Sequence, residues 1–302
     1  MSASTLTRPQ ASGAAPRRRT RVVEGTPWRR RSPLVFVADH ALLIALAVMF
    51  VAPFVFVLLT AVMSPEQAGT SFSWPTSWHW DNFAQVFEKL PMLKYFGNSF
   101  LYAGLATLFM LVSSVPAGYA LARIRFRGSR LYFFAIIAMM LLPPQVTSVP
   151  LYVMWSRLGL TGSLWPLILP NLLGDAFSIF LLRQFFLTIP AEYSEAARID
   201  GCGELRTLWR VILPMARPGI AATSIFLFFA SWNDYYGPLL YTSENESAWP
   251  VSYALAQFRG SRSVDWNLTM AATLIAMVPV VLVFLLAQRA FVRGVTLTGV
   301  KG

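Results

Sequence analysis

Long apolar stretches separated by short polar segments dominate the pattern along this chain. Four windows contain no Asp, Glu, Lys or Arg, namely residues 41–65, 95–122, 131–156 and 266–288. Two further windows, 158–182 and 218–243, are interrupted only by Asp175 and Asp234 respectively. Each window is longer than the roughly 20 apolar residues with which a helix crosses a bilayer, and none has the alternation of membrane β-strands. The pattern predicts an all-α polytopic membrane protein with six transmembrane helices.

The composition supports this class. Hydrophobic residues make up 56% of the 302 residues and charged residues 13%, whereas soluble domains contain about 25% charged residues. A single cysteine, Cys202, excludes an internal disulfide, and the two histidines, His40 and His79, lie far apart in the sequence. No metal site built from His and Cys is therefore expected.

The net charge of +11 is unevenly distributed over the predicted spans. Five of the 25 Lys and Arg residues fall on one side of the predicted membrane. The other twenty fall in the two terminal segments, the 123–130 loop and the 183–217 segment, which share a side if six spans are present. This asymmetry predicts that both termini are cytoplasmic. The charge therefore reports topology, and nucleic acid is not expected as a partner.

The predicted spans divide the chain into five segments. We expect a disordered basic cytoplasmic tail (1–33), a first transmembrane span (34–63), an outer loop with interfacial tryptophans (64–93), a core of five spans (94–288) and a cytoplasmic C-terminal tail (289–302). A charged cytoplasmic loop at 190–218 interrupts the core.

The third predicted span contains two adjacent prolines, Pro143 and Pro144. Proline lacks a backbone N–H and clashes with the preceding turn, so the helix should kink or break here. Carbonyl groups freed at membrane depth must meet protein or water. Two interpretations remain open, namely a packed kink and the wall of a hydrated pathway that Gln145 faces.

The charged loop has the pattern of two short helices joined at a glycine. Glu192 and Glu195 fall near the start of the first helix, where carboxylates interact favourably with the helix dipole. Asp200 and Gly201 close this helix, because glycine readily adopts the positive φ that a helix end requires.

The second helix of the loop has one apolar stripe at spacings of three and four residues, formed by Leu205, Leu208, Trp209, Ile212 and Leu213. We expect Pro214 and Pro218 to end this helix before the fifth span begins. The predicted unit is a rigid helix–turn–helix on the cytoplasmic surface with its apolar face toward the bundle. Ala196, Ala197 and the acids of the first helix are expected to face a partner.

The loop also resembles a known motif. Glu195-Ala196-Ala197, three residues, Gly201, nine residues, Val211, one residue and Leu213-Pro214 is similar to the EAA loop of binding-protein-dependent ABC importer permeases. Residues 180–201, 231–239 and 293–302 resemble segments of carbohydrate-uptake permeases of the maltose-permease type. The resemblance implies a type I ABC importer permease fold in a bacterial inner membrane, with residues 190–218 as a coupling-helix hairpin.

This resemblance implies a permease subunit that imports a sugar or oligosaccharide, or alternatively a polyol or a glycerophosphate-type solute. The implied partners are a second, different permease, two copies of a cytoplasmic ABC ATPase, an extracytoplasmic solute-binding protein and the lipid bilayer. The residues implied in coupling to the ATPase are Glu192, Glu195, Ala196, Ala197, Asp200, Gly201, Leu213 and Pro214.

The chain lacks the sequence needed to hydrolyse ATP by itself. A P-loop requires Gly-Lys followed by Ser or Thr, but Lys89, Lys94 and Lys301 are followed by Leu, Tyr and Gly. ATP and Mg²⁺ are therefore expected on the partner ATPase, and this chain is expected to be non-catalytic and without a cofactor. The positions of the two histidines argue against a Ser/His/Asp catalytic set.

A polar cluster in the fifth span is the candidate solute pathway. Trp232, Asn233, Asp234 and Tyr235 combine rings that can stack on a sugar with groups that can hydrogen-bond to it, and Gln145 joins them from the third span.

Two acids within the apolar windows need an explanation, because charged residues inside a membrane are costly. Asp175 and Asp234 are either ion sites of a secondary transporter, which is the rival class, or acids hydrated or hydrogen-bonded within the bundle.

Overall fold

The computed structural model describes residues 33–70, 74–258 and 265–299, and no strand occurs among them. Most of the predicted N-terminal tail (1–33) and the last three residues of the C-terminal tail lie outside these ranges. The chain divides into two compact units, residues 1–52 and residues 53–302. The described part of the first unit consists of one segment of helix α1 (Pro33–Ala61).

Apart from Asp39 and His40 near its start, helix α1 is almost entirely apolar, and it carries exposed Val, Leu, Ile and Phe side chains. It is long enough to cross a bilayer. The predicted first span at 34–63 is thus a single helix.

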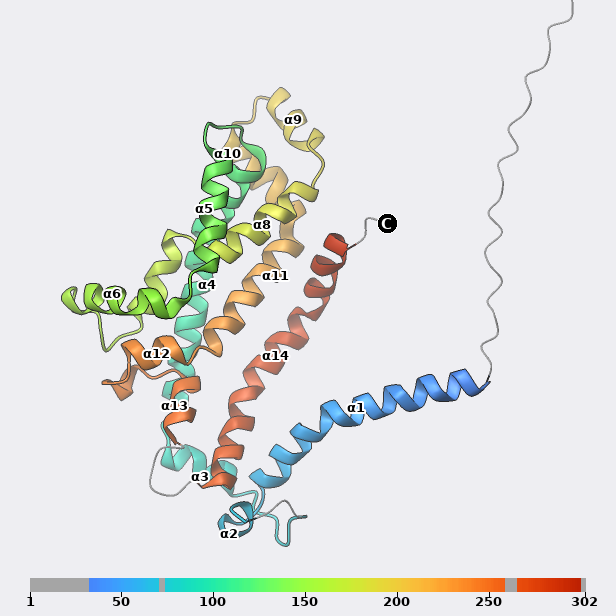
Figure 1. Cartoon of the computed structure of the whole chain (residues 1–302), viewed down its shortest axis with the longest axis vertical. Coiled ribbons are helices and arrows are strands. Elements are labelled where there is room, and N and C mark those ends of the chain that lie inside the picture. The colour runs from blue at the N-terminus through green and yellow to red at the C-terminus, as the bar shows by residue number, and fades with distance from the viewer. Residues whose placement is uncertain (1–32, 71–73, 259–264, 300–302) are drawn as a thin grey trace, which may run out of the picture. The chain divides into compact units, whose positions relative to one another are not determined.

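The second unit contains the other long apolar helices (Figure 1). They are α4 (Met92–Arg123), the run of α7 (Trp165–Ile168), η1 (Leu169–Leu173) and α8 (Ala176–Thr188), the run of α10 (Glu204–Thr207), η2 (Leu208–Ile212) and α11 (Leu213–Trp232), and α14 (Trp266–Gly299). Among the described residues, five helices including α1 could cross a membrane, and a bent pair makes six if it counts as one span. The prediction of an all-α membrane protein is confirmed.

The bent pair consists of α5 (Ser129–Leu141) and α6 (Pro144–Arg157), whose axes differ by 94°. The break falls at Pro143 and Pro144, where the sequence predicted it. Pro143 is extended and Pro144 begins the new helix, in agreement with the tolerance of proline in the first turn. The third predicted span is therefore two helices that cross almost at a right angle.

Close packing around α4 organises the second unit. Helix α4 packs most extensively against α8 and α11, and α11 packs against α14. A Cβ at Gly219 of α11 would lie 2.6 Å from Cδ2 of Phe185 in α8, so only glycine permits this approach. Small residues at such crossings are typical of membrane helices.

The shorter helices gather at the two ends of the second unit (Figure 1). Helix α9 (Glu192–Ile199) and α10 lie at one end, which we call the hairpin end. Helices α2 (Pro65–Ala68), α3 (Asn82–Lys89) and α13 (Val251–Phe258) lie at the opposite end, and α12 (Tyr236–Tyr241) lies between the two ends. One further short 3₁₀ helix, η3 (Glu246–Ala248), precedes α13.

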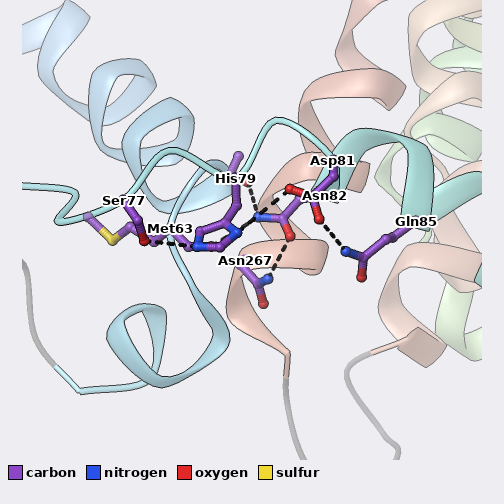
Figure 2. Close-up of polar contacts among 8 residues, drawn as sticks. Met63, Ser77, His79, Asp81, Asn82, Gln85 and Asn267 are labelled. Carbon is purple, nitrogen blue, oxygen red and sulfur yellow. Dashed lines mark hydrogen bonds and ion pairs between the residues drawn. The ribbon is translucent and has the colours of Figure 1, made fainter.

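A buried amide ties three elements together at the end opposite the hairpin (Figure 2). The Asn82 side chain donates to the carbonyl oxygens of Ala61 and Met63 at 2.9 and 3.0 Å. It accepts from Nδ2 of Asn267 in α14 at 3.1 Å. Asn82 thus satisfies carbonyl groups at the C-terminal end of α1 that have no helical partner.

Candidate functional site: the hairpin and the α6–α12 cavity

Helix α9 ends at a glycine with the geometry that the sequence predicted. Gly201 has φ of +77°. Its N–H donates to the carbonyl of Arg198 at 3.0 Å, and the N–H of Cys202 donates to the carbonyl of Ala197 at 2.9 Å. These two bonds form a Schellman motif, in which a residue of positive φ follows the helix. The chain thereby turns sharply from α9 into α10.

A small polar network fixes the angle between α9 and α10. Arg198 of α9 forms an ion pair with Oε1 of Glu204 in α10 at 2.9 Å. The other carboxylate oxygen of Glu204 accepts from the hydroxyl of Tyr119 in α4 at 2.9 Å. Because Tyr119 belongs to a membrane-spanning helix, the network connects the hairpin directly to the bundle.

The expected end of the second hairpin helix at Pro214 and Pro218 is wrong. The chain is helical from Glu204 to Trp232, so the second arm of the hairpin is the beginning of the fifth span. A π-helical turn at Leu208–Ile212 makes this possible, since Leu213 N–H bonds the carbonyl of Leu208 five residues back. The widened turn shifts the hydrogen-bond ladder and accommodates Pro214 directly after it.

The predicted apolar stripe of the second helix is only half buried. Leu208 and Ile212 are buried against α4 and α8. Leu205 and Trp209 have exposed fractions of 71% and 69%. Only one row of the predicted stripe, Leu208 and Ile212, packs against α4 and α8. The neighbouring row, Leu205 and Trp209, remains exposed.

The predicted partner-facing residues of the hairpin are mostly exposed, with one exception. Glu192, Glu195, Ala196, Asp200 and Gly201 are exposed, as is Pro214, while Leu213 is partly buried. Ala197 is buried, with an exposed fraction of 6%. The expectation that both alanines face outward is therefore wrong for Ala197, because the side of α9 that carries it turns toward the bundle.

Sequence inspection missed two residues that connect α4 to the hairpin and to the end of α8 that leads into it. One is Tyr119, described above, and the other is Arg123, the last residue of α4. Arg123 donates to the carbonyl oxygens of Phe186 and Ile189 at the end of α8. The four-residue spacing places Tyr119 and Arg123 on one face of α4. An arginine that ends an apolar run on the side of a charged loop is the signal that could have found this position.

A cavity of about 370 Å³ lies between α6 and α12. Of the predicted pathway residues, it brings Gln145 and Asp234 together. Its polar lining also includes Ser148, Tyr236 and Tyr241. These residues line the same cavity because the break at Pro143 and Pro144 directs α6 across the bundle toward α12.

The other predicted pathway residues do not line this cavity. Trp232 is buried and packs against Phe100, with ring centroids 4.9 Å apart. Asn233 donates to the carbonyl of Phe229 at the end of α11. Tyr235 lies beside the ring of Tyr253 instead. Trp232 is therefore a core residue in this conformation.

Both acids of the apolar windows have hydrogen-bond partners within the bundle. Asp175 caps the N-terminus of α8 by accepting from the N–H of Ser178 at 2.7 Å. Asp234 accepts from the hydroxyl of Tyr102 at 2.9 Å and from the N–H of Gly237 at 3.1 Å. These contacts agree with the interpretation that the acids are hydrogen-bonded within the bundle.

The structure brings a Ser, a His and an Asp together in the segment between α2 and α3, which the sequence analysis did not anticipate (Figure 2). Ser77 Oγ lies 2.8 Å from His79 Nε2, and Asp81 Oδ1 lies 3.7 Å from His79 Nδ1. The second distance exceeds that of a hydrogen bond. The histidine and aspartate side chains are 38% and 60% exposed. A hydrolase active site excludes water from such contacts, so this cluster does not have the geometry of a catalytic triad.

The helical bundle and its charged hairpin fit a membrane permease, and the comparison with known families gives the class. The profile of one family, described as "binding-protein-dependent transport system inner membrane component", matches residues 114–297. The chain belongs to this family.

Named relatives support the same class. The diacetylchitobiose uptake system permease protein NgcG of Streptomyces coelicolor is 33% identical over 262 residues, covering 85% of this chain and 86% of the relative. The sn-glycerol-3-phosphate transport system permease protein UgpE of Yersinia pestis is 37% identical over 198 residues, covering 65% and 70% respectively. The crystal structure of a bacterial ABC transporter involved in alginate import contains a chain with a TM-score of 0.74. That chain is 25% identical, and the match covers 88% of this chain and all of that one.

Proposed function

We propose that this chain is a permease subunit through which a binding-protein-dependent ABC importer takes up a sugar or oligosaccharide. The carbohydrate assignment is supported by the names of the diacetylchitobiose permease and of the alginate transporter. In this proposal the protein resides in a bacterial inner membrane, and the hairpin end and both termini are cytoplasmic.

One observation carries the coupling part of the proposal. The hairpin presents exposed acids and Ala196 outward, and its second arm is continuous with the membrane-spanning α11. A force applied to α9 by another protein would therefore act on α11 through the backbone and on α4 through Tyr119 and Arg123. This chain contains no P-loop, so the force must come from a separate ATPase.

We infer a transport cycle from this connection. ATP binding draws two ATPase subunits together and moves residues 191–213 inward, which opens the permease outward. A solute-binding protein then delivers the solute, and hydrolysis returns the permease to the inward-open state. A second, different permease completes the pathway, and this chain itself remains non-catalytic.

The α6–α12 cavity is the candidate solute contact of this subunit. Gln145, Ser148 and the tyrosine hydroxyl groups offer both donors and acceptors at its wall. Such groups suit the hydroxyl groups of a sugar.

A glycerophosphate-type solute is the second candidate, because the UgpE relative is named for sn-glycerol-3-phosphate. An ion-coupled carrier is less well supported. Asp175 and Asp234, its expected ion sites, are already occupied by hydrogen bonds that hold α8 and α12.

The deciding experiment is uptake into proteoliposomes that contain the complex purified through a tag on this chain. Solutes bound by the cognate binding protein, with oligosaccharides and glycerophosphates tested side by side, would serve as substrates. We expect uptake to require internal ATP and to be insensitive to ionophores. Uptake that continues without the ATPase and stops when ion gradients collapse would overturn the proposal.

A further inference from the structure

A second polar cavity, which we call the hairpin cavity, lies where the loop after α4 meets α9. Its volume is about 740 Å³, within the roughly 300–1,000 Å³ typical of ligand sites. It is lined by residues of the 121–129 segment on one side and by residues of the hairpin on the other. It is separate from the α6–α12 cavity and shares no residue with it.

The charge of the lining favours a monovalent anion. Three guanidinium groups, those of Arg123, Arg125 and Arg198, face two carboxylates, those of Glu195 and Glu204. The lining therefore has an excess of one positive charge.

The carboxylate of Glu204 already has two partners in the protein. It is paired with Arg198 and accepts from Tyr119. No ion pair of Arg125 occurs among the described residues, and its side chain is exposed. Arg125 is thus available to a ligand.

Two buried polar atoms, one on each side of the cavity, lack partners among the described residues. Ser194 lines the cavity with an exposed fraction of 4%, and its Oγ makes no hydrogen bond there. Arg123 bonds carbonyl oxygens through Nη2, while its buried Nε has no partner. Buried polar groups in proteins are nearly always satisfied. The unpartnered hydroxyl and the unpartnered guanidinium N–H belong to the two sides of the cavity, and a ligand that accepts hydrogen bonds between these sides would satisfy both.

We propose that the hairpin cavity binds a phosphate group, held by Arg125, Arg123 and Ser194. Phosphate oxygens accept strong hydrogen bonds from guanidinium groups, and a phosphodiester carries the single negative charge that matches the lining. Basic pockets between membrane helices on the cytoplasmic side are typical sites for anionic lipid headgroups. Two sources share this chemistry, an anionic phospholipid headgroup and free phosphate.

A bound phosphate would bridge the loop after α4 to helix α9. It would thereby limit the mobility of the hairpin, so that occupancy tunes the coupling of the importer. The inference rests on the proposed function for the side of the membrane on which the hairpin lies and for the role of the hairpin in coupling.

The test is native mass spectrometry of the delipidated complex with added phosphatidylglycerol or phosphatidylcholine. We expect preferential binding of phosphatidylglycerol, weakened about tenfold by Arg125→Gln combined with Ser194→Ala, because charge-assisted hydrogen bonds are lost. The matched control is Arg127→Gln, which removes one positive charge from the same loop but does not line the cavity. This control should bind as the unaltered complex does.

Competition identifies the source of the phosphate. If millimolar inorganic phosphate displaces the lipid from the unaltered complex but not from the double variant, free phosphate also uses the site. If it displaces nothing, the lipid headgroup is the ligand.

Equal weakening by Arg127→Gln and by the double variant would overturn the inference, because it would indicate general surface attraction. So would unchanged binding in the double variant. ATP-driven uptake measured on the same preparations keeps this failure distinct from a failure of the proposed function. In a second measurement, phosphatidylglycerol should slow amide hydrogen exchange across residues 192–201, and no change there would contradict the bridging role.

Discussion

Two glycines two positions apart in the hairpin have different backbone requirements. Gly201 has φ of +77°, whereas Gly203 has φ of −71° and ψ of 163°. A Cβ at either position would meet no atom within 4 Å. The difference between them is therefore one of backbone conformation and not of space.

We predict that Gly201→Val uncouples transport while Gly203→Val does not. A β-branched residue at positive φ is strained by roughly 1–3 kcal/mol, which the turn can relieve only by changing the angle between α9 and α10. Membrane insertion should remain normal, because the strain is local. The measurement is solute transported per ATP hydrolysed in the purified complex. Equal ratios for the two variants would contradict the prediction.

A second residue-scale prediction concerns the contact between α11 and α8. Gly219→Val should destabilise the bundle by several kcal/mol, since even one Cβ would overlap the Phe185 ring and overpacking typically costs 1–3 kcal/mol, occasionally more. Gly104→Val is the matched control, because a Cβ there meets nothing within 4 Å. Thermal unfolding in detergent should show a lower midpoint for the first variant alone. A normal midpoint for Gly219→Val would mean that the two helices can separate freely.

At the scale of elements, the angle of the hairpin depends on a network that is partly open to water. Arg198 and Glu204 are 47% and 39% exposed, and exposed ion pairs contribute about 1 kcal/mol or less. The Tyr119 hydroxyl adds one hydrogen bond from α4. These contacts between Arg198, Glu204 and Tyr119 are therefore weak enough to break under the force on α9 that the proposed transport cycle requires.

We predict that Glu204→Gln and Tyr119→Phe each speed amide hydrogen exchange in α9 by up to about fivefold, which corresponds to about 1 kcal/mol. Combining them should give less than the sum of the two separate effects, because Glu204→Gln already weakens the acceptor of the Tyr119 hydroxyl as well as the pair with Arg198. Glu244→Gln, an exposed acid far along the chain, is the control. Fully additive effects of the two hairpin variants would show that Tyr119 and Glu204 act independently.

The elements of the hairpin show what sequence can and cannot predict here. The glycine turn was predictable because Asp200-Gly201 follows a helical segment, and glycine alone adopts positive φ easily. The burial of Leu208 and Ile212 but not of Leu205 could not be predicted from the sequence. Apolar periodicity reveals neither the π-helical turn nor how much room α4 and α8 leave for this helix.

The α6–α12 cavity also could not be predicted from the sequence, because it is formed by residues far apart in the chain. The double proline predicted a break in the third span, but not the 94° direction of the new helix. Because α6 runs in that direction, Gln145 and Asp234 line the same cavity. Trp232 instead packs against Phe100 in the core. Tertiary packing therefore selects which of the predicted polar residues can share a pathway.

At the scale of the whole molecule, the proposed function makes α9, at the exposed end of the hairpin, the point of attachment for an ATPase. The two adjacent alanines of α9 test this directly. Ala196 is exposed, and Ala197 is buried against the bundle. Cys202 is partly accessible, so it must first be replaced by Ser to leave a single reactive thiol.

In that background we predict that Ala196→Cys forms cross-links to the ATPase with a short bifunctional reagent, and that Ala197→Cys forms at least tenfold fewer. A thiol buried against neighbouring helices is inaccessible to reagent, whereas an exposed thiol on the docking face is within reach. The extent of cross-linking at Ala196 should also change between the nucleotide-free and ATP-bound complex, since the proposed cycle moves residues 191–213. Equal cross-linking at both positions would mean that α9 is rotated in the assembled importer. Cross-linking at neither, in any nucleotide state, would place the ATPase elsewhere and remove the basis for coupling through the hairpin.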